Sequence, residues 1–499
     1  MRFEICILRF FIMSYTRRVA YNTTIQIIGK VITTLISLFL VAALTRYLGV
    51  AGYGQYTTIF AFTQFFAVIA DFGFFWFLVR EISKPNAPQK KIVNNVLTFR
   101  TLIALFIFSL TFLIGFFIPQ YHDIRYGIGI IAAASFWLTL NGTYVGIFQN
   151  RLRMDKAALT DVLGRLAILG GVFFLIGQGT DLNHILWAYF AGNMVNFFLS
   201  AYMGRIYVHF RPTFDFDYWR EIFRETLPIF LVSVLALISF KIDTVMLSLM
   251  RSSIDVGIYG PPYKVVEILI LLPGIFMGNV FPILTAYIYS KDLRLESAFQ
   301  KSFDFLVVIA IPIVVGVIMT AQRIIRIVAG PEFVGIHTIP PVFGIPATSS
   351  FALQILIVAV GLAYLSHLFS YMIIALGKQT KMIVPNIIFV VFNVGLNLIL
   401  IPKISYIGAA MVTILTEIIV VTIYWWLMRR YIDLKINIKT LLKVVLSGII
   451  LGLVLYFLRF LNLVYLVPIG IIVYIASLYL LKAVSKEMVV SLIRAEKGR

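Results

Sequence analysis

The 499-residue sequence has little charge and a single cysteine. Only 13% of its residues are Asp, Glu, Lys or Arg, whereas 61% are hydrophobic, and the mean hydropathy is +0.97. A soluble domain has about a quarter charged residues, because its surface must face water. The lone Cys6 excludes an internal disulfide and leaves the redox compartment undetermined. The composition thus excludes a soluble globular protein and indicates a membrane protein.

Signature motifs of enzymes and nucleotide-binding proteins are missing. The sequence contains no H-E-x-x-H, no cysteine cluster, no G-x-S-x-G and no G-x-x-x-x-G-K-[ST]. We therefore expect a protein that is not an enzyme, with no catalytic residue, no metal site and no cofactor. A coupling cation, H⁺ or Na⁺, is the one small ligand that we expect.

Acidic residues are scarce as well. The chain has 22 Asp and Glu against 42 Lys and Arg, a formal net charge of +20. In a soluble protein such a balance would suggest nucleic acid. Here the basic residues lie mostly in short connections between apolar runs, where they set membrane orientation. We expect the lipid bilayer as a partner, and no nucleic acid.

The N-terminus does not have the pattern of a signal peptide. MRFEICILRFFI carries Glu4 and Arg9 within its apolar part, and no A-x-A-like cleavage site follows. Met13 opens MSYTRRVAYNTT, so either Met1 or Met13 could be the natural start. We expect residues 1–20 to form a cytoplasmic tail.

Apolar runs of roughly 20 residues, long enough to cross a bilayer, recur from residue 21 almost to the end. Bounded by charge, Pro, Gly or Asn, they predict an all-α polytopic membrane protein with about fourteen transmembrane helices. The predicted spans are 21–44, 52–77, 97–118, 127–149, 162–179, 185–204, 227–250, 259–289, 303–328, 353–376, 383–402, 406–428, 443–458 and 464–481.

The basic residues test this count. With fourteen spans, 29 Lys and Arg fall on the side of the N-terminus, and the other 13 fall on the opposite side or within spans. The positive-inside rule then places both termini in the cytoplasm, in a cell membrane. One span more or fewer would invert the alternation from that point on, so the charge bias favours an even number.

The seventh and eighth spans weakly repeat the first and second. RYLGVAGYGQY at 46–56 is echoed by RSSIDVGIYGPPY at 251–263, each with a Gly and a Tyr before a further Gly. Repeated halves are common in secondary transporters, whose substrate site lies between the repeats.

Several stretches resemble a known family. NTTIQIIGKV, TRYLGVAGYGQY and ADFGF followed by VREI resemble the opening of the polysaccharide-biosynthesis exporters. These are the Wzx-like flippases of the multidrug/oligosaccharidyl-lipid/polysaccharide exporter superfamily. In the second half, KIDTVMLSLM, VGIYGPPYKVVE and NVGLNLILIPKISYIGAAMVTILTE agree with it. The resemblance covers essentially the whole chain from residue 14.

The resemblance implies a V-shaped transporter of two six-helix lobes with two added helices. The lobes would be 21–204 and 227–428, joined by a cytoplasmic linker at 205–226 and followed by 443–481 and a cytoplasmic tail at 482–499. Such proteins move undecaprenyl- or dolichyl-linked oligosaccharides from the cytoplasmic to the outer leaflet. A polyprenyl-linked glycan would be the substrate, and other polysaccharide assembly proteins are candidate partners.

Lys30 lies in an otherwise apolar span. Gln26, Lys30, Thr33 and Ser37 recur at helical spacing and form one polar stripe. Lys30 is about nine residues into the span, roughly 13 Å at 1.5 Å per residue, and part of this depth could be recovered by snorkelling. A snorkelling lysine needs no polar neighbours, however, and an intramembrane cation by default marks a substrate path. A lipid-linked sugar carries phosphate charge, which a cationic cavity would offset.

Lys241 and Lys264 are two further candidate cavity cations. Lys241, Thr244 and Ser248 share one helix face, whereas Asp243 lies about 200° away and could bind a coupling cation. Satisfaction of both charged groups by neighbouring helices is an equal alternative. Lys264 and Glu267 are spaced to pair with each other, which we favour over substrate contact, and Glu267 is the second candidate for coupling.

Other polar residues suggest gating or packing. Asp71 precedes Arg80 and Glu81, which allows a carboxylate–arginine gate or simple interfacial exposure. Asn386, Asn393 and Asn397 form a stripe that we interpret as interhelical hydrogen bonding, and His367 receives no role. Prolines in the eighth span favour bends that suit alternating access; they are Pro261, Pro262, Pro273 and Pro282.

Lipid-linked oligosaccharide flipping is the leading hypothesis. A drug/cation antiporter of the same superfamily would be expected to carry carboxylates in its N-terminal cavity, and the span 21–44 has none. A lipid II flippase remains open, because its cargo also carries a pyrophosphate. A membrane glycan polymerase or ligase would usually need a larger outer loop than the short ones predicted here.

Overall fold

The computed structural model describes the backbone of residues 2–483, and side chains from residue 21 onward except at positions 232, 236, 239 and 240. The Cys6 side chain and the part of the predicted tail beyond residue 483 lie outside this description. The described chain is helical, with one isolated bridge between Val342 and Ile345 as its only β pairing. It divides into two compact units, Met1–Gly257 and Ile258–Arg499.

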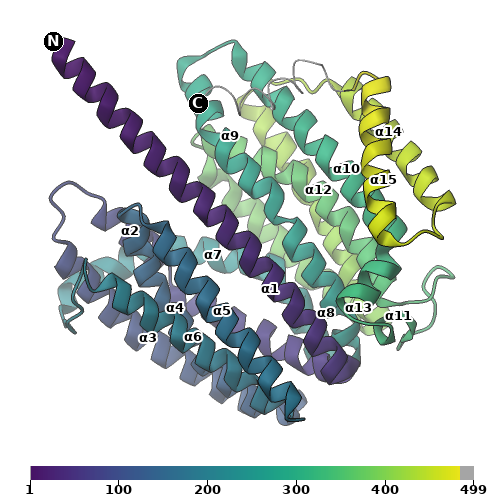
Figure 1. Cartoon of the computed structure of the whole chain (residues 1–499), viewed down its shortest axis with the longest axis horizontal. Coiled ribbons are helices and arrows are strands. Elements are labelled where there is room, and N and C mark those ends of the chain that lie inside the picture. The colour runs from purple at the N-terminus through teal and green to yellow at the C-terminus, as the bar shows by residue number, and fades with distance from the viewer. Residues whose placement is uncertain (1, 484–499) are drawn as a thin grey trace. The chain divides into compact units, whose positions relative to one another are not determined.

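The first unit is a bundle of long helices (Figure 1). Its elements are α1 (Arg2–Asp71), α2 (Phe74–Ile82), α3 (Gln89–Phe117), the 3-10 helix η1 (Pro119–Ile124), α4 (Arg125–Asn150), α5 (Met154–Gly177), α6 (Leu182–Gly204) and α7 (Phe216–Met250). Within this unit α6 packs on α4 and α5, and α1 packs on α5 and α7.

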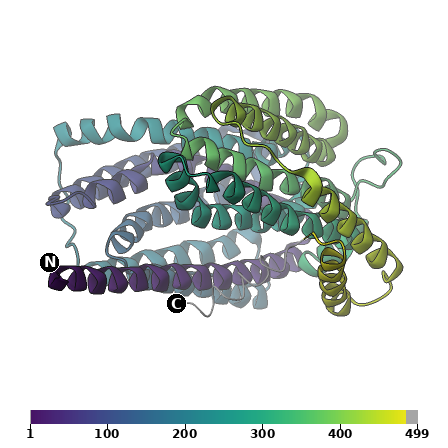
Figure 2. The same cartoon turned by 90° about the horizontal axis from the view of Figure 1, so that it is seen from above.

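The second unit contains the remaining helices. They are α9 (Leu271–Ser290), α10 (Arg294–Val328), α11 (Glu332–Gly335), α12 (Ser349–Ala375), η2 (Gln379–Met382), α13 (Ile383–Tyr431), α14 (Ile438–Phe457) and α15 (Leu463–Leu480), while α8 (Ser253–Leu269) begins in the first unit. Here α12 packs on α10 and α13, and the hairpin of α14 and α15 packs on α10 (Figures 1 and 2).

The helices match the fourteen predicted spans. Within the described residues, ten segments are long and apolar enough to cross a membrane. Two of them, Tyr21–Ile82 and Gln379–Tyr431, each hold two predicted spans, and α6 and α7 coincide with two more. The prediction of an all-α polytopic membrane protein is confirmed. The lobe boundaries at 204 and 227 stay a prediction, although α7 packs within the first compact unit.

Backbone breaks separate the paired spans. Gly49, with φ 65° and ψ −173°, interrupts α1 in a conformation that essentially only glycine adopts. Ile404 and Ser405 have non-helical backbone angles and interrupt α13 between the predicted spans 383–402 and 406–428. The predicted span 259–289 is also divided, since α8 ends at Leu269 and α9 begins at Leu271. Pro273 falls in the first turn of α9, where a missing N–H costs least.

The two echoed segments pack against each other. A methyl carbon added at Gly54 would lie 1.7 Å from the carbonyl oxygen of Ser253, and one added at Gly257 would lie 2.0 Å from that of Val50. The two backbones are therefore in direct contact, which small residues permit and any side chain would prevent. The echo marks a close helix contact within the first unit.

We expect Gly54→Ala and Gly257→Ala each to lower the free energy of unfolding by about 3 kcal/mol, because the backbones must separate to admit the methyl group. Thermal unfolding in detergent measures this. Gly274→Ala is the matched control, since no atom lies within 4 Å of its added carbon. Equal unfolding midpoints for all three variants would contradict the close contact.

Candidate functional site

The polar stripe of α1 runs beside the face that packs on α5. Gly29 lies against Ala158, and the side-chain oxygen of Asn22 accepts a hydrogen bond from the Met154 N–H at 2.7 Å. Thr33 is buried, Ser37 is partly buried, and Gln26 and Lys30 are exposed. The stripe therefore lies along the edge of the α1–α5 interface, and Lys30 is accessible there.

A cation and a carboxylate of α5 extend this stripe. Arg165 donates from Nη1 to Ser37 Oγ at 3.3 Å, and its Nε lies 3.3 Å from Asp161 Oδ1. Ser37 follows Lys30 by seven residues, two helical turns along the same face. The α1–α5 strip, defined here as Gln26, Lys30, Ser37, Asp161 and Arg165, thus carries two cations and one carboxylate.

Asp71 has a different partner from the one that its position near Arg80 suggested. It forms an ion pair with Arg100 of α3, whose side chain is 3% exposed. Arg100 also donates to Thr143 of α4 at 3.2 Å. The chain turns at Phe72 and Gly73, both with positive φ, so α2 leaves in a new direction. The structure pairs Asp71 with Arg100 rather than with Arg80, and gating by Asp71 and Arg80 stays a prediction beside simple interfacial exposure of Asp71.

Arg80 belongs to a charged cluster at the end of α2. It pairs with Glu81 at 3.0 Å and with Glu225 of α7, and Lys84 pairs with Glu81 at 2.5 Å. These pairs hold the start of α7 beside α2. Only the Arg80–Glu225 pair is exposed on both sides and therefore weak, because the Glu81 side chain is 12% exposed.

The start of α7 is fixed by a second contact with α3. Asp215 caps the helix by accepting from the Tyr218 N–H at 3.0 Å, and its other oxygen pairs with Lys91 at 2.9 Å. The Lys91 hydrogen bond holds the pKa of the Asp215 carboxyl below its ordinary value. The interaction with Lys91 therefore stabilises the folded state fully at pH values above the ordinary pKa of Asp215. This stabilisation is lost as the pH falls through the lowered pKa.

The polar residues predicted on α7 are buried. Lys241 is 9% exposed and Asp243 is 2% exposed, and both take part in further interactions. Ser248 hydrogen-bonds with Tyr121 of η1 at 2.8 Å, which fixes this end of the face inside the first unit. The proposed contact of Lys241 with substrate, and of Asp243 with a coupling cation, stay predictions.

In the second unit the predicted pairings form. Lys264 lies 2.9 Å from Glu267, as their spacing predicted. Asn386 accepts from Tyr424 at 2.6 Å, and Asn393 donates to Thr416 at 3.3 Å, so the asparagine stripe joins the two halves of α13. His367 bonds to the carbonyl of Ala363 within its own helix.

Arg100, Arg165 and Glu417 are polar residues to which sequence reasoning gave no role. Glu417 accepts from Ser366 at 2.5 Å, from α12 to α13. Each residue is a charged group within a predicted apolar span, a signal that by itself marks a functional candidate. Within residues 21–483, no three His, Cys, Asp or Glu side chains are grouped as a metal site would require. A coupling cation at Asp243 or Glu267 remains a prediction.

The chain is similar to a known protein family and to a named relative. The family model described as polysaccharide biosynthesis protein matches residues 19–288. The chain belongs to this family. A relative from Haloferax volcanii, named as the probable low-salt glycan biosynthesis flippase Agl15, is 22% identical over 416 residues, which cover 82% of this chain and 84% of that protein.

Solved structures share the fold. The lipid II flippase MurJ in an inward closed conformation superposes with a TM-score of 0.71 at 19% identity, over 95% of this chain and 99% of that one. An inward-facing multidrug resistance transporter of the MATE family and MOP superfamily gives 0.63 at 16% identity, over 79% and 95%. These relatives are named as flippases and transporters. The chain is a multi-pass membrane transport protein of this family and not an enzyme.

The ion pair of the buried Arg100 with the half-buried Asp71 gives a stability prediction. We expect Asp71→Asn to lower the free energy of unfolding by about 3 kcal/mol, because it leaves the Arg100 guanidinium buried without its anion. Asp71→Asn combined with Arg100→Met should recover part of the loss, since it removes the stranded charge. Thermal unfolding in detergent measures both.

The control for this series is Asp123→Asn, because the Asp123 side chain is 83% exposed. A loss in Asp71→Asn no larger than in this control would contradict the buried pair.

Proposed function

We propose that this transporter moves a polyprenyl-(pyro)phosphate-linked oligosaccharide, a polysaccharide repeat unit, from the inner to the outer leaflet by alternating access. The observation that carries the proposal is the α1–α5 strip, in which Lys30 and Arg165 place two cations inside predicted membrane spans beside a single carboxylate. An excess of positive charge in an apolar layer suits an anionic cargo.

The physical reason lies in desolvation. A phosphate that leaves water for the apolar layer incurs a large free-energy cost, and so does an uncompensated lysine. Each charge reduces the cost of the other when they meet in the membrane. Lys30 can therefore be retained at a depth where it would otherwise only destabilise the helix.

The remaining predicted residues take subordinate roles in this proposal. Lys241 and Lys264 would add positive charge, although Glu267 offsets that of Lys264. Arg80 and its acidic partners would act as a latch on the side that the charge bias predicts to be cytoplasmic, where both termini would also lie. Asp243 or Glu267 would bind the coupling cation, H⁺ or Na⁺.

The names of the relatives support a glycan-lipid cargo, and a lipid II flippase is the close alternative. The Haloferax volcanii protein is named as a glycan biosynthesis flippase, and the MurJ protein as a lipid II flippase. The first name refers to glycan biosynthesis and the second to a lipid cargo, and both agree with the proposed glycan lipid. A drug/cation antiporter shares the fold, but the sign of the charge on the α1–α5 strip argues against a cationic cargo.

The test is transport of a fluorescent polyprenyl-pyrophosphate oligosaccharide in reconstituted vesicles. We expect Lys30→Ala to slow transport at least about tenfold and Lys30→Arg to retain most of it, because a charged hydrogen bond contributes about 1.5–3 kcal/mol. Lys443→Ala is the matched control, as this half-buried lysine of α14 donates to the Lys482 carbonyl.

Equal transport by all these variants would remove Lys30 from the substrate path. Export of organic cations by the parent, without movement of the glycan lipid, would contradict the proposed function itself.

A further inference from the structure

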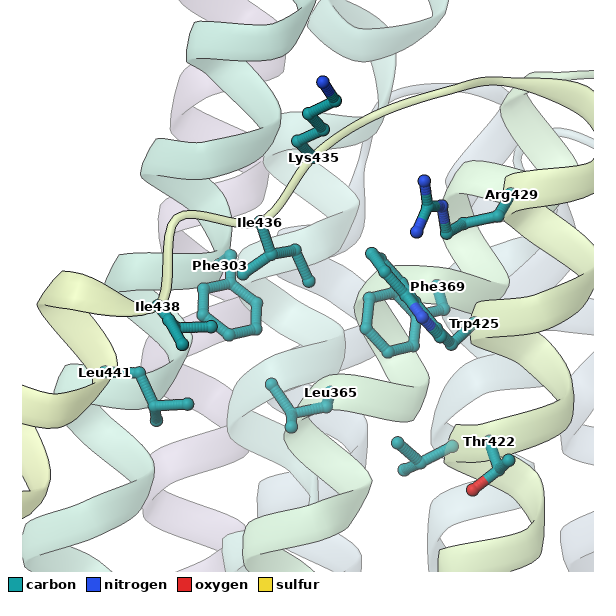
Figure 3. A pocket seen from close by; sticks show the side chains of 11 residues that line it. Phe303, Leu365, Phe369, Thr422, Trp425, Arg429, Lys435, Ile436, Ile438 and Leu441 are labelled. Carbon is teal, nitrogen blue, oxygen red and sulfur yellow. The ribbon is translucent and has the colours of Figure 1, made fainter.

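A cavity in the second unit lies apart from all the residues considered so far. It is an open pocket of about 580 Å³ between α10, α12, the end of α13, the start of α14 and the connection from α13 to α14. Phe303, Phe369 and Trp425 form its aromatic wall, and the rings of Phe369 and Trp425 lie 5.2 Å apart (Figure 3). Its size and apolar walls are typical of a small-molecule site.

The cavity is amphipathic along its depth. Figure 3 shows Leu365 and Leu441 among the apolar side chains, with Arg429 and Lys435 at the end bordered by the connection. The Arg429 guanidinium lies 5.5 Å from the centre of the Trp425 ring, so the aromatic wall holds it over the cavity. One end of the site is thus cationic and the other is apolar.

Two carboxylates, Asp433 and Glu296, lie near the two cations and offset their charge. Arg429 pairs with Asp433 at 2.8 Å, and this pair is exposed and therefore weak. The same hydrogen bond keeps the pKa of Asp433 below its ordinary value, so Asp433 is an anion that competes for Arg429. Lys435 also lines a neighbouring cavity with Glu296, and no ion pair between the two is found among the described residues.

We infer that this cavity binds a phosphate-bearing bilayer lipid, with an acyl chain against the Phe303–Phe369–Trp425 wall and the headgroup phosphate between Arg429 and Lys435. Basic pockets between transmembrane helices on the predicted cytoplasmic side have this chemistry. A soluble anion would leave the apolar wall unused, and an uncharged lipid would leave the two cations unused. The bound lipid would brace the connection between α13 and α14.

The experiment uses the full-length protein in detergent, with native mass spectrometry and thermal unfolding in titrations of phosphatidylglycerol or phosphatidylcholine. We expect phosphatidylglycerol to be retained and to raise the unfolding midpoint, and phosphatidylcholine to do so less. Arg429→Gln with Lys435→Gln should weaken phosphatidylglycerol binding about 30-fold, at about 1 kcal/mol for each cation. Neither measurement uses a glycan lipid, so the result is independent of the proposed cargo.

The matched control removes the same charge from the same segment. Arg430→Gln with Lys439→Gln alters two exposed cations that do not line the cavity. Asp433→Asn should tighten binding several-fold, because it frees Arg429. Leu441→Trp should block binding by filling the apolar part while both cations remain, and these two variants keep the test decisive if the double Gln variant fails to fold.

Three results would overturn the inference. They are equal weakening by the control pair, displacement of phosphatidylglycerol by inorganic phosphate alone, and tighter binding of polyprenyl phosphate than of phosphatidylglycerol. The second would mean that the headgroup alone is recognised. The third would assign the cavity to the carrier of the proposed cargo.

Discussion

The cost of an uncompensated charge in the apolar layer governs this structure. A bilayer offers no water to a buried cation or carboxylate, so each such group must find a partner within the protein or face a polar interior. Arg100 meets this requirement with Asp71 and Thr143, and Lys264 meets it with Glu267. The same constraint makes Lys30 informative, because it is exposed beside a polar strip rather than enclosed by partners.

The requirement also explains which helices stay together. Within the first unit, Asp71 at the end of α1, Arg100 of α3 and Thr143 of α4 form one buried network. Within the second, Asn393 and Thr416 join the two halves of α13, and Ser366 and Glu417 join α12 to α13. Polar groups in membrane helices thus contribute specific contacts where apolar packing alone would leave the register undefined.

Much of this could be predicted from the sequence, and the remainder shows where sequence reasoning stops. The spans, the break near Pro273 and the Lys264–Glu267 pair depend on neighbours along the chain, so periodicity and spacing were sufficient. The partner of Asp71 depends on the turn at Phe72 and Gly73, which sends Arg80 elsewhere and leaves room for Arg100. The positions of Arg165 and Glu417 opposite Ser37 and Ser366 depend on helix packing, which no pattern in one helix reveals.

The central claim is that Lys30 faces a water-accessible interior and not lipid. The most direct measurement is the rate at which Lys30→Cys, in a Cys6→Ser background, reacts with a membrane-impermeant thiol reagent, compared with Val31→Cys on the adjacent exposed apolar face. We predict rapid modification at position 30 and slow modification at position 31. Slow modification at both positions would place Lys30 against lipid and reduce it to a snorkelling anchor.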